Sequence, residues 1–223
     1  MDKTTPLIAS VTVPTFNRPY SGLTSFVRLM GTLEDTVENP DDIEILVKID
    51  EGDTKAYDLC KEYEERYNHF HFWVTPSAGY KGINTYHDFL ASKSKGQFIM
   101  ITADDNIMET KGWDRILYNY IDKTTWWLKP FHGQPTAGNL SQIMHRHLYE
   151  LVGHTGRYPT DWFWDNIQFM YPIQWDAPDI RYLHSWTGFP EENATDDMQG
   201  PLHLDMAEAR RIIKLVTAER SKL

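Results

Sequence analysis

The chain has 223 residues, and 41% of them are hydrophobic, which is enough to bury the core of one domain. Its formal net charge of -10 at pH 7 argues against a protein that coats nucleic acid or binds an anionic membrane surface. The one cysteine, Cys60, excludes an intramolecular disulfide, and the lack of a membrane-length apolar stretch or a signal-peptide core in residues 1–10 predicts a soluble, cytoplasmic protein.

The first half of the chain alternates strand-like and helix-like patterns. Apolar runs typical of buried strands cover Leu7–Val13, Ile43–Ile49, Phe70–Val74 and Phe98–Thr102. The stretches between them place apolar residues at helical spacing, in residues 24–33, around Leu59 to Tyr67, and in residues 82–95. Because strand–helix–strand units join parallel strands by right-handed crossovers, this pattern predicts an α/β fold with a doubly wound, mostly parallel, Rossmann-like sheet.

The second half is less regular. We expect helices at Gly112–Tyr120 and Asn139–Val152, and short strands at Thr124–Phe131 and Ile180–His184. The acidic segment 189–201 has no periodicity and is bounded by proline and glycine, which predicts a loop. An amphipathic helix is expected at 204–223. Without an internal repeat or a linker, the chain is expected to form a single domain over residues 1–223.

Polar residues follow each of the four predicted strands of the first half. Ligands of open α/β sheets bind at the carboxyl ends of the strands, so these segments are expected to meet at one edge. Threonine, asparagine and arginine offer hydrogen-bond donors, a carboxylate accepts from a base or a ribose, and a glycine-flanked lysine suits a phosphate. Together they predict a nucleotide site made of Pro14-Thr15-Phe16-Asn17-Arg18, Asp50-Glu51-Gly52-Asp53, Ala78-Gly79-Tyr80-Lys81-Gly82 and Asp104-Asp105.

The pair Asp104-Asp105 indicates a divalent cation. Two adjacent carboxylates at the end of a buried strand repel each other and lose hydration, and a cation with oxygen ligands offsets that cost. Such pairs also occur in turns and helix caps, and that alternative stays open.

The segments VTVPTFNRP, GYKGIN and GQFIMITADDNIM together resemble family 2 glycosyltransferases of the GT-A fold. The resemblance implies that Asp50 contacts the nucleobase and that Asp104 and Asp105 bind ribose and metal, with Asp105 the better metal ligand. It also places Lys81 near the diphosphate and matches Asn84 to a recurrent asparagine. It makes residues 1–108 the half that binds the nucleotide sugar, residues 109–203 the acceptor-side half, and residues 204–223 a closing helix.

In the acceptor-side half, the resemblance fits Asp165 to the catalytic base of inverting members. Asp161 is the rival, and its alternative role is a helix N-cap. His184 is a candidate third metal ligand, or a structural histidine. Trp164 and Trp186 are the tryptophans expected to line the sugar pocket, and the alternative is that they build the core.

The resemblance implies an inverting, hexosyltransferase-type enzyme that depends on Mn²⁺ or Mg²⁺. It would transfer a sugar from a nucleotide diphosphate sugar, with a UDP-sugar favoured, to a hydroxyl of a carbohydrate or glycoconjugate acceptor. A nucleotidyltransferase would need a glycine-rich, basic loop after the first strand, which PTFNRPYSG lacks. A glycoside hydrolase using Asp161 and Asp165 leaves the nucleotide-like edge without a purpose. A non-catalytic binding protein that keeps the fold remains the open alternative.

Overall fold

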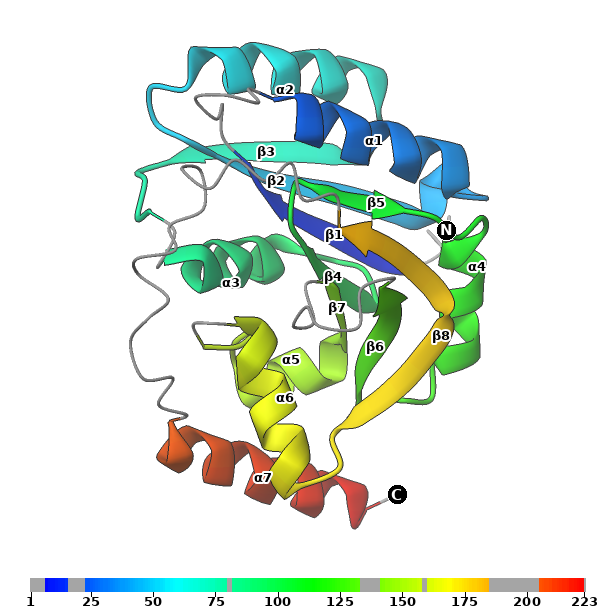
Figure 1. The fold of residues 1–223 in the computed structure, drawn as a ribbon, viewed down its shortest axis with the longest axis vertical. Helices are drawn as coiled ribbons and strands as arrows, with labels where there is room; N and C mark the ends of the chain where they lie inside the picture. Colours follow the sequence, from blue (N-terminus) through cyan, green and yellow to red (C-terminus); the bar gives the residue numbers. More distant parts are fainter. Residues whose placement is uncertain are drawn as a thin grey trace, which may run out of the picture.

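The computed structural model describes residues 7–15, 23–79, 82–132, 141–157, 160–184 and 205–222, and for residues 132, 141, 160–162 and 184 it describes the backbone only. Within these ranges, eight strands form one curled sheet in the order β3-β2-β1-β4-β7-β6-β8-β5 (Figure 1). The strands are β1 (Ala9–Pro14), β2 (Ile43–Asp50), β3 (Phe70–Thr75), β4 (Phe98–Thr102), β5 (Asn106–Met108), β6 (Trp127–His132), β7 (Ser141–His145) and β8 (Gln174–His184).

The longer helices follow the strands of the first half and cover the second. They are α1 (Thr24–Thr36), α2 (Thr54–Arg66), α3 (Ile83–Lys93), α5 (Arg146–Val152), α6 (Thr160–Met170) and α7 (Met206–Arg220). Short helical turns are η1 (Pro40–Asp42), α4 (Trp113–Ile116) and η3 (Leu117–Tyr120). None of the helices in the part of the chain that the structure describes is long and apolar enough to cross a membrane.

The parallel half of the sheet confirms the predicted doubly wound architecture. Strand β1 pairs in parallel with β2 on one side and β4 on the other, and β3 continues the sheet beyond β2. Helices α1 and α2 lie on one side of these strands and α3 on the other (Figure 1). The predicted apolar runs in β1, β2 and β4 are buried because both faces of these strands are covered. The run in β3, at the edge of the sheet, is only partly buried, and Val74 is exposed.

The other half of the sheet is mixed, and it corrects one prediction. The helix expected over 139–152 begins only at Arg146, because the residues just before it form β7, which runs antiparallel to β4 and β6. Ile143 and Met144 are both fully buried between those neighbours, and such a short apolar run reads the same in a buried strand as in a buried helix. The short strand expected at 180–184 belongs to the longer β8, and the predicted loop 189–201 lies outside the described residues.

Helices α5, α6 and α7 enclose a second apolar core against β6 and β7. Its buried members include Trp127, Leu148, Trp164, Ile167, Ile212 and Val216. Polar contacts hold α7 against this second core. His154 and Glu208 are joined at 2.6 Å, and Arg211 donates to the backbone carbonyl of Val152. Arg211 also donates to the Glu208 carboxylate at 2.6 Å, and this bond, with the contact to His154, holds the pKa of Glu208 down at about 2. The Glu208 carboxylate therefore stays charged over the whole physiological range.

Gly96 precedes β4 at a point where two backbones touch. A Cβ atom there would lie 2.6 Å from the backbone nitrogen of Ser10, which real Cβ atoms essentially never do. The Gly96 amide donates to the Ser10 hydroxyl at 2.8 Å, so the glycine cannot move away without losing this bond.

We therefore expect Gly96→Ala to lower the free energy of unfolding by about 1–3 kcal/mol, as overpacking of a rigid contact does. The matched control is Gly31→Ala, in the middle of α1, where an added Cβ meets nothing within 4 Å. That change should raise stability by about 0.5–1 kcal/mol, because alanine favours helix. Urea unfolding followed by circular dichroism measures both, and equal effects of the two substitutions would contradict the close contact at Gly96.

Candidate functional site

The ends of β1 and β4 meet through a direct hydrogen bond. Both strands run in the same direction with Thr12 opposite Ile101, so the residues that follow them lie at one edge of the sheet. The Thr15 hydroxyl donates to the Asp104 carboxylate at 2.7 Å, and both side chains are buried. Two of the four predicted segments thus meet at one edge of the sheet.

The register between β5 and β8 brings His184 to the same edge. In this antiparallel pair Asn106 lies opposite His184, one residue beyond Asp105. Cα atoms of such opposite residues are about 4.5–5.5 Å apart. The backbone therefore supports the expected neighbourhood of Asp104, Asp105 and His184, although the side chain of His184 is outside the described set.

The acidic pair has the chemistry of a hard-cation site. Asp104 and Asp105 are buried with 4% and 8% of their surface exposed, and carboxylate oxygens are the ligands that Mn²⁺ and Mg²⁺ take in proteins. Among the described side chains, no three of the types His, Cys, Asp or Glu form a metal cluster. The two aspartates fit the cation as a partial ligand set.

Asp50 is the last residue of β2 and the first of the second predicted segment. Its carboxylate is in contact with the ammonium group of Lys48, and its side chain remains 25% exposed. Lys48 itself is almost completely buried, and its Nζ lies 3.7 Å from the centroid of the Tyr86 ring on α3. Sequence reasoning missed Lys48 and Tyr86; the signal for Lys48 is its place two residues before Asp50, which puts both on one face of the strand.

The remaining donor-side residues are placed in part. Pro14 ends β1, and Asn84 is half-buried in the first turn of α3. Asn17, Arg18 and Lys81 lie outside the described residues, as does Trp186 of the acceptor side.

On the acceptor side, Asp165 is half-buried on α6. Its carboxylate is 3.8 Å from Nζ of Lys129 on β6. Asp161 lies four residues earlier in the first turn of the same helix, where only the backbone is described. The structure therefore supplies Asp165 with a cationic neighbour that the sequence did not indicate, and it leaves the choice between the two aspartates as a prediction.

The expectation that Trp164 lines the sugar pocket is wrong. Its side chain is fully buried in the second core, stacked on Trp127 with ring centroids 6.4 Å apart. Its indole Nε1 donates to the carbonyl of Thr155 at 2.7 Å. No ring face remains to stack on a sugar, so Trp164 is a core residue, the alternative that its sequence position left open.

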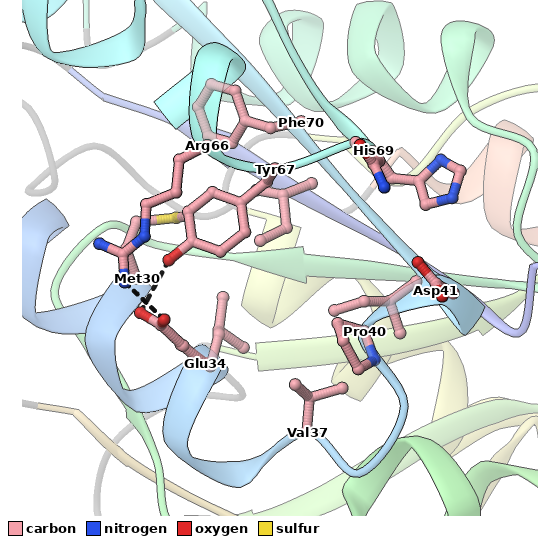
Figure 2. A pocket seen from close by; sticks show the side chains of 13 residues that line it. Met30, Glu34, Val37, Pro40, Asp41, Arg66, Tyr67, His69 and Phe70 are labelled. Carbon is pink, nitrogen blue, oxygen red and sulfur yellow. Dashed lines mark hydrogen bonds and ion pairs between the residues drawn. The ribbon is translucent and has the colours of Figure 1, made fainter. Parts of the chain in front are cut away.

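A cavity of about 300 Å³ lies at the beginnings of β2 and β3, at the end of the sheet opposite to Asp50 and Asp104 (Figure 2). Apolar side chains such as Met30 and Phe70 line it, and its rim carries Glu34, which accepts hydrogen bonds from Arg66 and Tyr67. Because it borders the beginnings of β2 and β3, it is not part of the edge that carries Asp50 and Asp104.

His87 is a buried histidine that contacts β1, one of the strands that lead to the site. It extends from α3 to β1, where its Nδ1 is 3.0 Å from the Thr12 hydroxyl, and that hydroxyl donates to the carbonyl of Met100. Because the hydrogen of the Thr12 hydroxyl points to Met100, the hydroxyl oxygen accepts a hydrogen bond from His87. In the neutral imidazole ring, Nδ1 therefore carries the hydrogen. Burial lowers the pKa of His87 to about 3.

This neutral histidine predicts acid sensitivity. Between pH 6.5 and about 3 the unfolded chain binds a proton at His87 that the folded chain does not, so stability falls as the pH is lowered through this window. The loss is at most about 1.4 kcal/mol per pH unit for one group. His87→Gln keeps a donor for Thr12 without a titrating ring, so its unfolding free energy should fall less steeply between pH 6.5 and 4.5. A wild-type slope in this variant would mean that His87 is charged in the fold.

Comparison with known proteins finds the likeness in structure only. No family model and no curated protein sequence matches the chain. The mannosyltransferase PcManGT from Pyrobaculum calidifontis, in complex with GDP-Man and Mn²⁺, matches with a TM-score of 0.64 at 11% identity, over 97% of this chain and 71% of its own. S. aureus TarS 1–349 in complex with UDP-GlcNAc matches with a TM-score of 0.61 at 14% identity, over 82% of this chain and 62% of its own.

A third solved structure, GalNAc-T7 with UDP, GalNAc and Mn²⁺, matches with a TM-score of 0.59 at 12% identity, over 80% of this chain and 43% of its own. The chain thus spans less than two thirds of TarS 1–349 and of GalNAc-T7. At such identities the likeness concerns the fold, and the fold of this chain is that of the GT-A type glycosyltransferases.

Proposed function

We propose that the protein is a glycosyltransferase that transfers a hexose-type sugar from a nucleotide diphosphate sugar to an acceptor hydroxyl. The observation that carries this proposal is the edge at which the Thr15–Asp104 hydrogen bond and the Asn106–His184 register gather Thr15, Asp104, Asp105 and His184. The neighbours of the same fold hold GDP-Man, UDP-GlcNAc, or UDP with GalNAc, which supports a nucleotide sugar as donor. We favour a UDP-sugar.

The donor would lie across the carboxyl ends of the parallel strands. Asp50 would accept a hydrogen bond from the base, and Asp104, oriented by Thr15, would accept one from the ribose. Pro14 and Asn84 border this space, while Asn17, Arg18 and Lys81 supply donors and positive charge for the diphosphate.

Mn²⁺ or Mg²⁺ would be held by Asp105 with Asp104 and His184. When bound, it would supply Lewis-acid stabilisation of the negative charge on the departing nucleoside diphosphate. The neighbours that contain Mn²⁺ support this choice of cation. The protein's own part is to keep two carboxylates buried and oriented at the place where that charge develops.

On the acceptor side, Asp165 would remove the proton of the attacking hydroxyl as its oxygen forms a bond to the anomeric carbon. Attack on the face opposite the leaving diphosphate inverts the configuration. Lys129, 3.8 Å from the Asp165 carboxylate, would fix the orientation of this base. Asp161 is the second candidate, and Trp186 remains a candidate for the sugar pocket.

The nucleotide site can be tested by thermal shift with UDP, GDP, TDP and CDP, each with Mn²⁺ and with a chelator. At about 100 times its dissociation constant a ligand adds roughly 2.7 kcal/mol of stability, or about 5–10 °C in a chain of this size. We expect a shift that depends on Mn²⁺ in the wild type and is lost in Asp105→Asn. Asp122→Asn, on an exposed loop, is the control and should keep the shift. No shift with any nucleotide would contradict the proposed function.

The assignment of the base is tested separately. Asp165→Asn should reduce sugar transfer by about 10²–10⁴-fold, the usual contribution of a general base, and leave the dissociation constant of UDP unchanged. The same loss in Asp161→Asn, with full activity in Asp165→Asn, would reassign the base to Asp161. If the wild type binds nucleotide yet releases no nucleoside diphosphate from any donor sugar, the protein is the non-catalytic binding alternative.

A further inference from the structure

Lys48 occupies a position where a charged side chain is costly. It is 1% exposed in the middle of a parallel sheet, and an ammonium group withdrawn from water must be offset by partners. Its Nζ has two of them, the Oδ1 atom of Asp50 and the face of the Tyr86 ring at 3.7 Å.

The same residue ties together the segments that form the candidate donor site. The backbone carbonyl of Lys48 accepts a hydrogen bond from the amide of Thr15 at 2.9 Å, which fixes the chain as it leaves β1. The hydroxyl of Tyr86 in turn accepts from the amide of Ala78, in the segment after β3. Lys48 therefore connects the ends of three strands, and its ammonium group contacts the partly exposed carboxylate of Asp50 at the end of β2.

The contact leaves the two oxygens of Asp50 unequal. Oδ1 is engaged by Lys48, and within the described part of the chain no donor approaches Oδ2. A carboxylate held in this way offers one outward oxygen to a ligand. Uracil presents one imide N–H between two carbonyl groups, which suits a single acceptor. Guanine presents two neighbouring N–H groups on one edge, which suit a carboxylate with both oxygens available.

We propose that Lys48 is a positioning residue that orients Asp50 and, by engaging Oδ1, selects a nucleobase with a single imide donor over guanine. The proposal rests on the proposed function, because it deepens the role of Asp50 in binding the donor. The residue that carries this selectivity, Lys48, lies inside the strand Ile43–Asp50.

The experiment is isothermal titration of UDP, TDP, CDP and GDP in the presence of Mn²⁺, on the wild type and on Lys48→Met. Methionine keeps the unbranched apolar length of lysine without the charge. We expect the wild type to bind UDP and TDP more tightly than GDP. In Lys48→Met the dissociation constant for UDP should rise roughly tenfold, as expected for the loss of a charge-assisted contact, and that for GDP should change little.

The selectivity ratio separates positioning from a merely structural role. A general loss of stability would weaken UDP and GDP alike, whereas release of Oδ1 changes their ratio. Lys48→Arg, which keeps a cation beside Asp50, should recover part of the preference for UDP. Lys61→Met, an exposed lysine on α2, is the matched control and should change neither constant.

If Lys48→Met does not fold, Lys48→Gln replaces it, since the amide can still donate to Asp50 without a charge, and a smaller shift in the same direction is expected. An unchanged ratio of UDP to GDP binding in a folded Lys48 variant would overturn the proposal, as would a wild type that prefers GDP. A wild type that binds no nucleoside diphosphate would instead contradict the proposed function itself, so the two failures are distinguishable.

Discussion

The parallel pairing of β1 with both β2 and β4 is the constraint on which the rest of the structure depends. This pairing requires the backbone at Gly96 to approach that of Ser10 more closely than a residue with a side chain would allow. It also aligns the carboxyl ends of β1, β2 and β4 at one edge of the sheet. The positions of Thr15, Asp50 and Asp104 at this edge then follow from the register. A slip of one residue would turn Thr12 away from His87 and move the polar residues of β2 to the opposite face.

The polar residues buried in β2 show how this alignment is held. Glu44 and Lys48 are each 1% exposed and lie on the same face of the strand, near its two ends. Glu44 accepts from the Ser10 hydroxyl at 2.6 Å, close to the start of the sheet, and Lys48 contacts Asp50 at its finish. Because a buried charge without its partner is strongly destabilising, these contacts disfavour other registers as well as stabilising this one.

The first half of the fold could be predicted from the sequence because its strands are short apolar runs bounded by proline, glycine and acidic residues. The second half could not be predicted in the same detail. The apolar residues of β7 give no period that distinguishes a strand from a helix, and the burial of Trp164 depends on helices far away in the sequence. For the site, the order of the strands was enough to place Asp50 and Asp104 at one edge, and the two-residue spacing of Lys48 and Asp50 was a local signal for their contact. Lys129 beside Asp165 is a tertiary contact that no local pattern indicates.

The packing of α7 has a consequence for the order of folding during synthesis. Most of the first core is contributed by residues from Ile8 to Tyr120, so much of it can assemble while the rest of the chain is still being made. The second core closes only when Ala209, Ile212 and Val216 have left the ribosome, because they cover Trp127 and Trp164 from outside. Until then Trp127, Phe163 and Trp164 stay accessible to chaperones, and the second core is the last part of the molecule to become native.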